Sequence, residues 1–423
     1  MDREFSMNLS WPTKFSDREE EYQRWIEICR EFGIGCVRIF LVPWGINPLG
    51  SSDDMDFICK IIQKARELSI EVVLVIDTYV NYVMHPYRDF VDCEYGWFSN
   101  CFSKNKSIKT FLTENGKTGY LDKVSEVLLV IEPYENVNRI ELCNEIDQIE
   151  SNRRNVVFWI NNNIKELRER FGNRFEYRVS ISNHREYRFF EKHINCRCDI
   201  HTYRFPYNTA LENYEYLSLN YPNAWISEFA FYSDFAYSET IESKVYFAAM
   251  ILCAHFEKCA EFPAPWWWEK ILSDSVYMGI YDHIITIDVQ LKRKKNSVLA
   301  FKELEKKKQD AKMKNKIQYR LSVLRKNPLF IVQEVPSIRK YLHKKLHPKF
   351  NHSYAAAGYE SNSGDLYVIL ETYVPVEVTG NPGRENDAMI KCIDLIRDQK
   401  MISIKLDDAE HLQEGTYLFV IPE

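Results

Sequence analysis

The chain has 423 residues, of which 45% are hydrophobic, so a large buried core is expected and a wholly disordered chain is excluded. No apolar run approaches the length of a membrane-spanning helix, and residues 1–5 do not begin a secretory signal. The 11 cysteines follow no framework spacing, which indicates reduced thiols. These features predict a cytoplasmic protein with no part in the membrane.

The net charge of −6 is unevenly distributed, because residues 292–349 are rich in Lys and Arg. A basic run of this kind would suit nucleic acid or an anionic membrane. Glu303, Glu305 and Asp310 interrupt it, however, and aromatic residues that could stack on bases are sparse. We therefore interpret the run as a solvated helix and linker, and expect neither nucleic acid nor a membrane as a partner.

From the N-terminus to residue 304, short apolar runs alternate with longer amphipathic stretches. The predicted strands are residues 5–9, 35–42, 71–76, 139–143, 177–181, 199–203, 224–228 and 261–267. The predicted helices between them include residues 18–32, 54–68, 155–171 and 238–256. This alternation predicts a (β/α)₈ TIM barrel over residues 1–304. A doubly wound open sheet is the alternative, but no glycine-rich phosphate loop follows the first strand.

Beyond the barrel, residues 305–316 are almost wholly charged and predict a helix or linker. Residues 317–423 then predict a small α+β domain, with strands at 366–378, 401–406 and 416–421 and a helix at 387–397. This domain holds no catalytic constellation. The sequence does not assign its role. One possibility is that it carries the main function, such as docking of a protein partner, with the barrel as a scaffold.

Polar and aromatic residues stand at or just beyond the carboxyl ends of the predicted barrel strands, where TIM-barrel enzymes place their catalytic groups. In chain order they are Arg38, Trp44, Asp77, Asn144, Glu145, Ser182, His184, His201, Tyr203, Glu228, Trp266, Trp267 and Trp268. These side chains would therefore point into one concave site at the end of the barrel. They comprise two carboxylates, a guanidinium, imidazole and phenol groups, and an indole face.

Several short motifs in this set resemble, in the same order, those of the clan A glycoside hydrolases, particularly the cellulase- and mannanase-like enzymes. They are the arginine of strand two (Arg38), Asn144-Glu145 after strand four, His201-Thr202-Tyr203 in strand six, Glu228 in strand seven and the strand-eight tryptophan. The resemblance covers most of the first 300 residues and none of the C-terminal domain. The histidine that these enzymes carry near the end of strand three has no clear match, although His85 follows in the next loop.

The resemblance implies a retaining β-glycosidase that acts on an oligosaccharide or glycoside. Glu145 would be the general acid/base and Glu228 the nucleophile, about 5–5.5 Å apart as retaining enzymes require. Asn144 would bind the sugar 2-hydroxyl, while Arg38 and Tyr203 would hydrogen-bond Glu228 and keep it ionised.

The same resemblance assigns further residues to substrate binding. His201 would hold Glu145 or a substrate hydroxyl, and Trp44, Asp77, Trp266 and Trp267 would line the sugar subsites. For single residues a structural role stays open: Asp77 could cap a helix, and at least one strand-eight tryptophan should belong to the core. The long aromatic connection at 78–104 predicts a lid, with an inserted mini-core or an oligomer contact as the alternative.

We predict no metal and no cofactor. Cys196 and Cys198 would lie on one face of a strand and His201 on the other, so they cannot share a zinc ion. Two other functions stay open for the barrel. It could be a transglycosylase, because the same covalent intermediate can pass to a sugar, or a non-hydrolytic glycan-binding protein.

Overall fold

The computed structural model describes residues 5–9, 19–40, 52–76, 116–148, 153–204, 209–231, 240–266, 268–287, 291–293, 299–301, 330–334, 354–380, 389–397, 401–405 and 410–421. The chain divides into two compact units. The first comprises Met1–Thr202, Asn223–Phe229 and Glu261–Leu272. The second comprises Tyr203–Pro222, Ala230–Ala260 and Ser273–Glu423.

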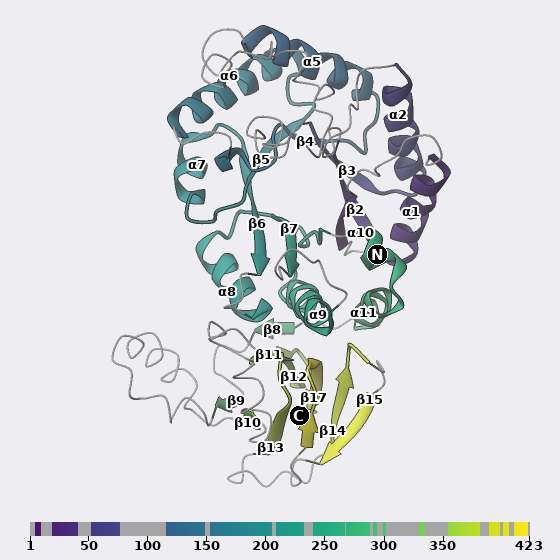
Figure 1. The fold of residues 1–423 in the computed structure, drawn as a ribbon, viewed down its shortest axis with the longest axis vertical. Coiled ribbons are helices and arrows are strands. Elements are labelled where there is room, and N and C mark those ends of the chain that lie inside the picture. Colours follow the sequence, from purple (N-terminus) through teal and green to yellow (C-terminus); the bar gives the residue numbers. More distant parts are fainter. Residues whose placement is uncertain are drawn as a thin grey trace, which may run out of the picture. The chain divides into compact units, whose positions relative to one another are not determined.

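The first unit is built on a parallel sheet of seven strands that pair in chain order (Figure 1). They are β1 Phe5–Leu9, β2 Ile34–Phe40, β3 Glu71–Val75, β4 Arg139–Glu141, β5 Glu176–Ile181, β6 Arg197–Arg204 and β7 Ile226–Phe231. Residues 264–266 close the sheet between β7 and β1. Phe229 N donates to Ala264 O at 3.1 Å, and Asn8 N donates to Pro265 O at 3.2 Å. The predicted barrel is thus confirmed, and this closing segment occupies the place of the predicted eighth strand.

The helices α1 Glu19–Glu31, α2 Ser52–Glu67, α5 Gly116–Ile131, α6 Arg153–Phe171 and α7 Tyr187–His193 lie outside strands β1 to β5 (Figure 1). Helix α6 illustrates the reason for this position, because its buried residues recur at helical spacing and form one face that packs inward. They are Val156, Trp159, Ile160, Asn163, Ile164, Leu167 and Phe171. Strand β2 is buried at every residue, as a parallel strand covered on both faces should be.

The second unit combines helices α8 Ala210–Asn220, α9 Ile241–Phe256 and α11 Ser275–Thr286 with two mostly antiparallel sheets. A short helix, α10 Trp268–Ser273, joins the closing segment of the barrel to α11. The six-stranded sheet consists of β15 Met401–Lys405, β14 Met389–Asp394, β17 Gly415–Ile421, β12 Leu366–Thr372, β11 Tyr354–Ser361 and β8 Leu291–Arg293. The four-stranded sheet consists of β16 Glu410–Leu412, β13 Val376–Gly380, β10 Phe330–Glu334 and β9 Leu299–Phe301.

Residues from both sheets, among them Val368, Val376, Ile390 and Phe419, bury one common apolar cluster. Strands β8 and β9 precede residue 304, the predicted end of the barrel domain. They nevertheless pair with β11 and β10 in these sheets.

Two predictions for the C-terminal region were wrong. Residues 389–394 form strand β14 rather than part of a helix, because they pair on both sides, with β15 and with β17. The alternating burial of Ile390 and Cys392 fits this strand, and pairing outweighs the local helical pattern. The single strand predicted at 366–378 is two strands in different sheets. Pro375 separates them, since proline has no N–H to continue a ladder. The described part of the C-terminal region is thus rich in antiparallel strands.

Within the second unit, the sheets are fastened directly to helices α8 and α9. The buried carboxylate of Glu371 on β12 accepts hydrogen bonds from Ala210 N at 2.7 Å and Leu211 N at 3.0 Å, at the start of α8. Thr416 Oγ1 on β17 donates to Val245 O on α9 at 2.9 Å. Helix α9 is buried continuously from Val245 to Phe256, as expected for a helix that is apolar all round. No helix in the described ranges combines the length and hydropathy needed to cross a membrane.

Candidate active site

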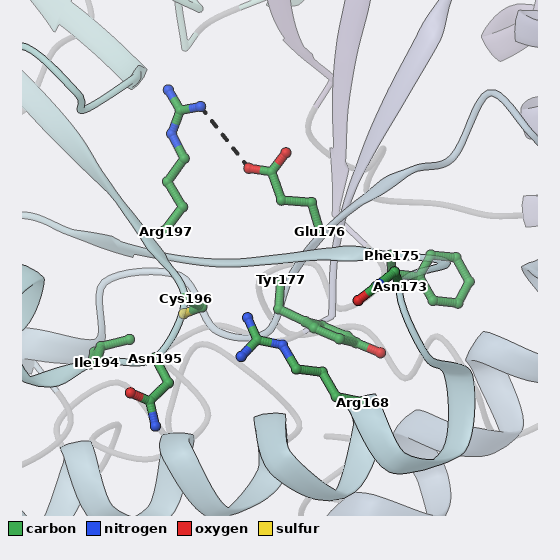
Figure 2. Close-up of a pocket in the computed structure, with 9 residues that line it drawn as sticks. All are labelled: Arg168, Asn173, Phe175, Glu176, Tyr177, Ile194, Asn195, Cys196 and Arg197. Carbon is green, nitrogen blue, oxygen red and sulfur yellow. Dashed lines mark ion pairs between the residues drawn. The ribbon is translucent and has the colours of Figure 1, made fainter.

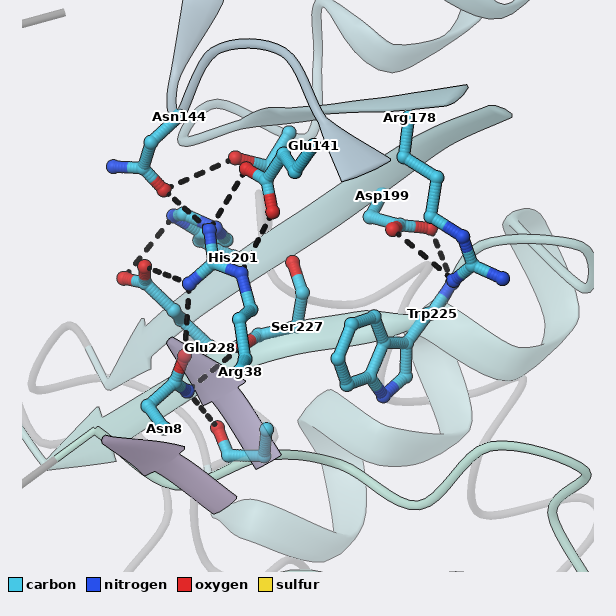
Figure 3. A network of polar contacts seen from close by, with 12 residues as sticks. Asn8, Arg38, Glu141, Asn144, Arg178, Asp199, His201, Trp225, Ser227 and Glu228 are labelled. Atoms are coloured by element: carbon cyan, nitrogen blue, oxygen red, sulfur yellow. Dashed lines mark hydrogen bonds and ion pairs between the residues drawn. The ribbon is translucent and has the colours of Figure 1, made fainter. Parts of the chain in front are cut away.

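A polar cluster occupies the carboxyl-terminal end of the barrel in the first unit (Figure 3). Each member comes from a different part of the parallel sheet: Asn8 from β1, Arg38 from β2, Glu141 from β4 with Asn144 and Glu145 just beyond it, Ser180 from β5, His201 from β6 and Glu228 from β7. Parallel strands deliver their ends to one rim, so residues more than 200 positions apart meet there.

Arg38 is the centre of this cluster and is completely buried. Its Nε and Nη2 atoms donate to the two carboxylate oxygens of Glu141 at 2.7 and 2.8 Å. Its Nη1 donates to Glu228 Oε1 at 2.6 Å and to Asn8 Oδ1 at 2.8 Å, and Nη2 also reaches Asn144 Oδ1 at 2.7 Å. Burial disfavours the charged guanidinium, but the carboxylates of Glu141 and Glu228 outweigh it and raise the pKa of Arg38. The arginine therefore stays cationic and fixes Glu228 in place.

Glu145 and Glu228 both approach the same ring nitrogen of His201. The Nδ1 atom of His201 is 2.8 Å from Glu145 Oε1 and 3.3 Å from Glu228 Oε2. One carboxylate oxygen of each glutamate and the histidine nitrogen all lie within 4.8 Å of one another. This separation matches the spacing of about 5–5.5 Å in retaining glycosidases and is shorter than the roughly 6.5–9.5 Å of inverting ones.

The two carboxyl groups of this short bridge have different charged neighbours. Burial, followed by the nearby negative charge of Asp147, raises the pKa of Glu145 to about 8, against the opposing effect of Arg38. Glu145 therefore holds a proton at neutral pH, whereas Glu228 has the Arg38 guanidinium at 2.6 Å. Burial also lowers the pKa of His201, so its imidazole is neutral there. A carboxylic acid beside a carboxylate that an arginine holds is the pairing needed for acid-assisted nucleophilic substitution.

The structure brings together five of the predicted site residues. Figure 3 shows Arg38, Asn144, His201 and Glu228 close together, and Glu145 joins them through its contact with His201. Trp266 lies on the closing segment, with its ring packed edge-to-face on Phe40 at 5.3 Å between centroids. Tyr203 is half-buried and falls in the second unit, so its contact with Glu228 stays a prediction. Trp44, Asp77, Trp267 and the proposed lid at 78–104 lie outside the described residues.

Sequence reasoning missed three members of the cluster: Asn8, Glu141 and Ser180. All three are fully buried polar side chains within predicted strands. A signal for Glu141 was present, since a buried arginine such as Arg38 requires a carboxylate partner and Glu141 alternates with Cys143 along the strand. Asn8 and Ser180 carry no comparable signal, because single polar residues are common in strands.

Within the described residues, Glu145, His201 and Glu228 are the one group of three potential metal ligands. Cys196 and Cys198 do not join His201 in such a group among these residues. The Arg38 guanidinium already supplies a positive charge to Glu228, and His201 already contacts Glu145.

A separate hollow of about 510 Å³ lies near the amino-terminal ends of β5 and β6, away from the glutamate pair (Figure 2). It is lined by Arg168, Asn173, Phe175, Glu176, Tyr177, Ile194, Asn195, Cys196 and Arg197. Glu176 and Arg197 pair across it at 4.0 Å. The Tyr177 hydroxyl is buried without a hydrogen-bond partner, and no atom of the carboxylate cluster lines this hollow.

Comparison with known proteins bears on the fold. No family model and no curated protein matches the sequence. The chain is similar to the solved structure of a GH5_18 protein from Streptomyces cattleya in complex with GlcNAc, with a TM-score of 0.50 and 11% identity over 70% of this chain and 84% of that one. The barrel has the fold of clan A glycoside hydrolases.

Two further solved structures are similar at lower scores. A glycoside hydrolase family 5 protein from Bacteroides vulgatus gives a TM-score of 0.49 and 9% identity over 99% of this chain and 89% of that one. The endo-1,4-β-mannanase from Rhizomucor miehei gives 0.46 and 12% identity over 67% and 94%. At such identities the likeness concerns the fold alone, and the reaction must be argued from the site.

Proposed function

We propose that this protein is a retaining β-glycosidase that hydrolyses an oligosaccharide or glycoside, with Glu145 as general acid/base and Glu228 as nucleophile. One observation carries the proposal. One oxygen of each carboxyl group lies within 4.8 Å of the other, and the two groups have different charged neighbours. Glu145 has its pKa raised to about 8, while Glu228 accepts a hydrogen bond from the Arg38 guanidinium at 2.6 Å.

In the first step Glu145 donates its proton to the glycosidic oxygen as the bond from that oxygen to the anomeric carbon breaks. Glu228 attacks the same carbon from the opposite face and forms a covalent glycosyl ester, and the aglycone leaves as an alcohol. Arg38 holds Glu228 Oε1, so we assign the attack to Oε2, which lies 3.3 Å from His201 Nδ1. In the second step Glu145, now ionised, takes a proton from water, the resulting hydroxide attacks the anomeric carbon, and Glu228 departs as a carboxylate.

Asn144 is suited to hold the sugar 2-hydroxyl. Its Oδ1 accepts hydrogen bonds from Arg38 Nη2 at 2.7 Å and Ser180 Oγ at 3.2 Å, which fixes the orientation of the amide. Its Nδ2 has no hydrogen-bond partner among the described residues and is free to donate. A donor next to the anomeric carbon strengthens its bond as the oxocarbenium-like transition state forms.

The test is hydrolysis of a panel of aryl β-glycosides. The names of the similar structures, which include mannanase and a GlcNAc complex, make β-mannosides and β-N-acetylglucosaminides the first substrates to try. Glu228→Ala and Glu145→Ala should each lose activity by roughly 10²-fold or more, the scale of one acid/base or nucleophilic contribution. Glu176→Gln, which alters a half-exposed carboxylate at the opposite end of the barrel, is the matched control and should retain native rates.

Azide separates the two roles. In Glu228→Ala it should attack from the vacated face and give a glycosyl azide of inverted configuration. In Glu145→Ala it should intercept the glycosyl ester and give the retained configuration. Equal activity in both variants and the native protein would refute the proposal. Glycan binding that is unaffected by either substitution, without turnover, would instead favour the recognition alternative.

A further inference from the structure

The backbone of Glu145 adopts an unusual conformation. Its φ is 55°, in the left-handed region that residues with a Cβ atom seldom occupy. The conformation turns the chain sharply after Asn144, and it carries the Glu145 carboxyl to within 2.8 Å of His201 Nδ1. A disfavoured backbone of this kind persists only where surrounding contacts over-determine it.

Ser180 holds the chain on the N-terminal side of this turn. The Glu145 N–H donates to Ser180 Oγ at 3.0 Å, and Ser180 Oγ donates to Asn144 Oδ1 at 3.2 Å. Ser180 is fully buried in β5, where its backbone is paired with Asp199 of β6. One hydroxyl thus fixes the two consecutive residues, Asn144 and Glu145, to the neighbouring strand.

Asp147 holds the chain on the C-terminal side of this turn. Its Oδ1 accepts from Ser182 N at 2.9 Å, and its Oδ2 accepts from Ser182 Oγ and Asn183 N, both at 2.9 Å. Gln148 N donates to Glu145 O at 3.0 Å and closes the short 3₁₀ turn η3 Ile146–Gln148 around Asp147. The loop after β5 therefore hydrogen-bonds Asp147, two residues beyond Glu145, while Ser180 of β5 hydrogen-bonds Glu145 itself.

We propose that Ser180 and Asp147 are positioning residues that clamp the left-handed backbone of Glu145 from both sides and so aim its carboxyl at the glycosidic oxygen. The inference rests on the proposed role of Glu145 as general acid/base. Loss of either contact lets the turn relax, and the carboxyl leaves the short bridge that it forms with His201.

Asp147 has a second effect, because its negative charge helps to raise the pKa of Glu145, after burial. The other titratable or charged groups that face Glu145 are Arg38 on β2, Glu141 on β4, His201 on β6 and Glu228 on β7. Asp147→Asn removes one negative charge and leaves these four in place. It should therefore lower the pKa of Glu145 and move the alkaline limb of the pH–rate profile to lower pH.

The test compares two substrates in Ser180→Ala, Asp147→Asn and the control Asp274→Asn, which alters a carboxylate that caps α11 in the second unit. Hydrolysis of a phenyl β-glycoside needs the acid, whereas a 2,4-dinitrophenyl β-glycoside has a leaving group that departs without it. We expect both clamp variants to lose roughly tenfold or more in kcat/KM on the phenyl substrate, a fraction of the ~10²–10⁴ that a general acid contributes. Formation of the glycosyl ester from the dinitrophenyl substrate should change far less, and the control should match the native protein on both.

Equal slowing on both substrates would overturn the clamp while leaving the proposed function intact. Native rates in Glu145→Ala would refute the proposed function instead. A measurement that does not require turnover then tests the clamp. The carboxyl ¹³C signal of Glu145, identified by its absence in Glu145→Gln, is titrated by NMR to give the Glu145 pKa. An unchanged Glu145 pKa in Asp147→Asn would contradict the proposal whether or not the protein is active.

Discussion

The two ends of the barrel both contain buried arginines, but they balance charge differently. At the carboxyl-terminal end, Arg38 is the cation among three carboxyl groups, those of Glu141, Glu145 and Glu228. At the amino-terminal end, three arginines converge on Glu261, and the same arginines also pair with Glu71, Glu176 and Asp199. Glu261 accepts from Arg139 at 2.8 Å and Arg178 at 2.7 Å, and it also pairs with Arg197.

The consequence of this difference appears in the carboxyl groups. Although burial opposes ionisation of Glu261, its arginines outweigh burial and lower its pKa. At the other end, burial, followed by the negative charge of Asp147, outweighs Arg38 and raises the pKa of Glu145 to about 8. Burial raises the pKa of a carboxyl group at both ends, since the fully buried Asp199 at the amino-terminal end has a pKa of about 7 despite Arg178 and Arg197. The comparison teaches that close contact with three arginines lowers the pKa of Glu261, whereas burial outweighs the single nearby cation at Glu145 and makes it an acid.

The largest expected effect is at the amino-terminal end. Glu261→Gln leaves three arginines without their shared carboxylate, so it should lower the free energy of unfolding by about 3–5 kcal/mol, as for other broken buried ion pairs. Urea unfolding at pH 7 measures this loss. Turnover per folded molecule should not change, and a variant that stayed stable but became inactive would break the comparison.

Glu145→Gln should do the reverse and stabilise the protein above neutral pH. The folded-state pKa of about 8 lies above the value of ~4.3 for an exposed glutamate, so ionisation favours the unfolded chain and stability falls as pH rises between these values. Glutamine removes that cost. The free energy of unfolding at pH 8 should be roughly 4 kcal/mol higher than in the native protein, while at pH 4 the two should be alike. Equal stability of the two proteins at both pH values would contradict the raised pKa.

Trp225→Phe probes the packing between the arginines. The indole Nε1 donates to Phe262 O at 2.7 Å, and the ring centroid lies 5.9 Å from Arg139 Cζ and 5.7 Å from Arg178 Cζ. Phenylalanine keeps an aromatic face but leaves the carbonyl unpaired, so a loss of about 1–2 kcal/mol is expected. Thermal unfolding would show the loss, and kcat should be native if this end is purely structural.

The smallest effect is expected at the solvent-exposed margin of the same network. Glu176 pairs with Arg178 at 2.8 Å, but its side chain is 48% exposed. Water and salt screen such a pair, and Glu176→Gln should therefore cost less than about 1 kcal/mol. A loss as large as that of Glu261→Gln would show that the network works as one unit rather than through its buried centre.

The sequence predicted most of the barrel, because strand and helix periodicities are local properties. The apolar runs at 5–9, 71–76 and 177–181 became β1, β3 and β5 within a residue at either end. The prediction of a helix at 387–397 failed, because the apolar residues there fit a helical face as well as a strand. These residues are Ala388, Met389, Ile390 and Ile393. Pairing with β15 and β17 decided between helix and strand, and those partners lie elsewhere in the chain.

For the site, the sequence by itself determined which strand ends carry Arg38, Asn144, Glu145, His201 and Glu228, because a barrel brings parallel strand ends to one rim. Only the tertiary structure decided which of these groups is acid and which is held as a carboxylate. That distinction depends on burial, on the two hydrogen bonds from Arg38 to Glu141, and on the left-handed turn that Ser180 and Asp147 hold at Glu145. Distances between side chains set electrostatic energies, and those distances exist only once the barrel has closed.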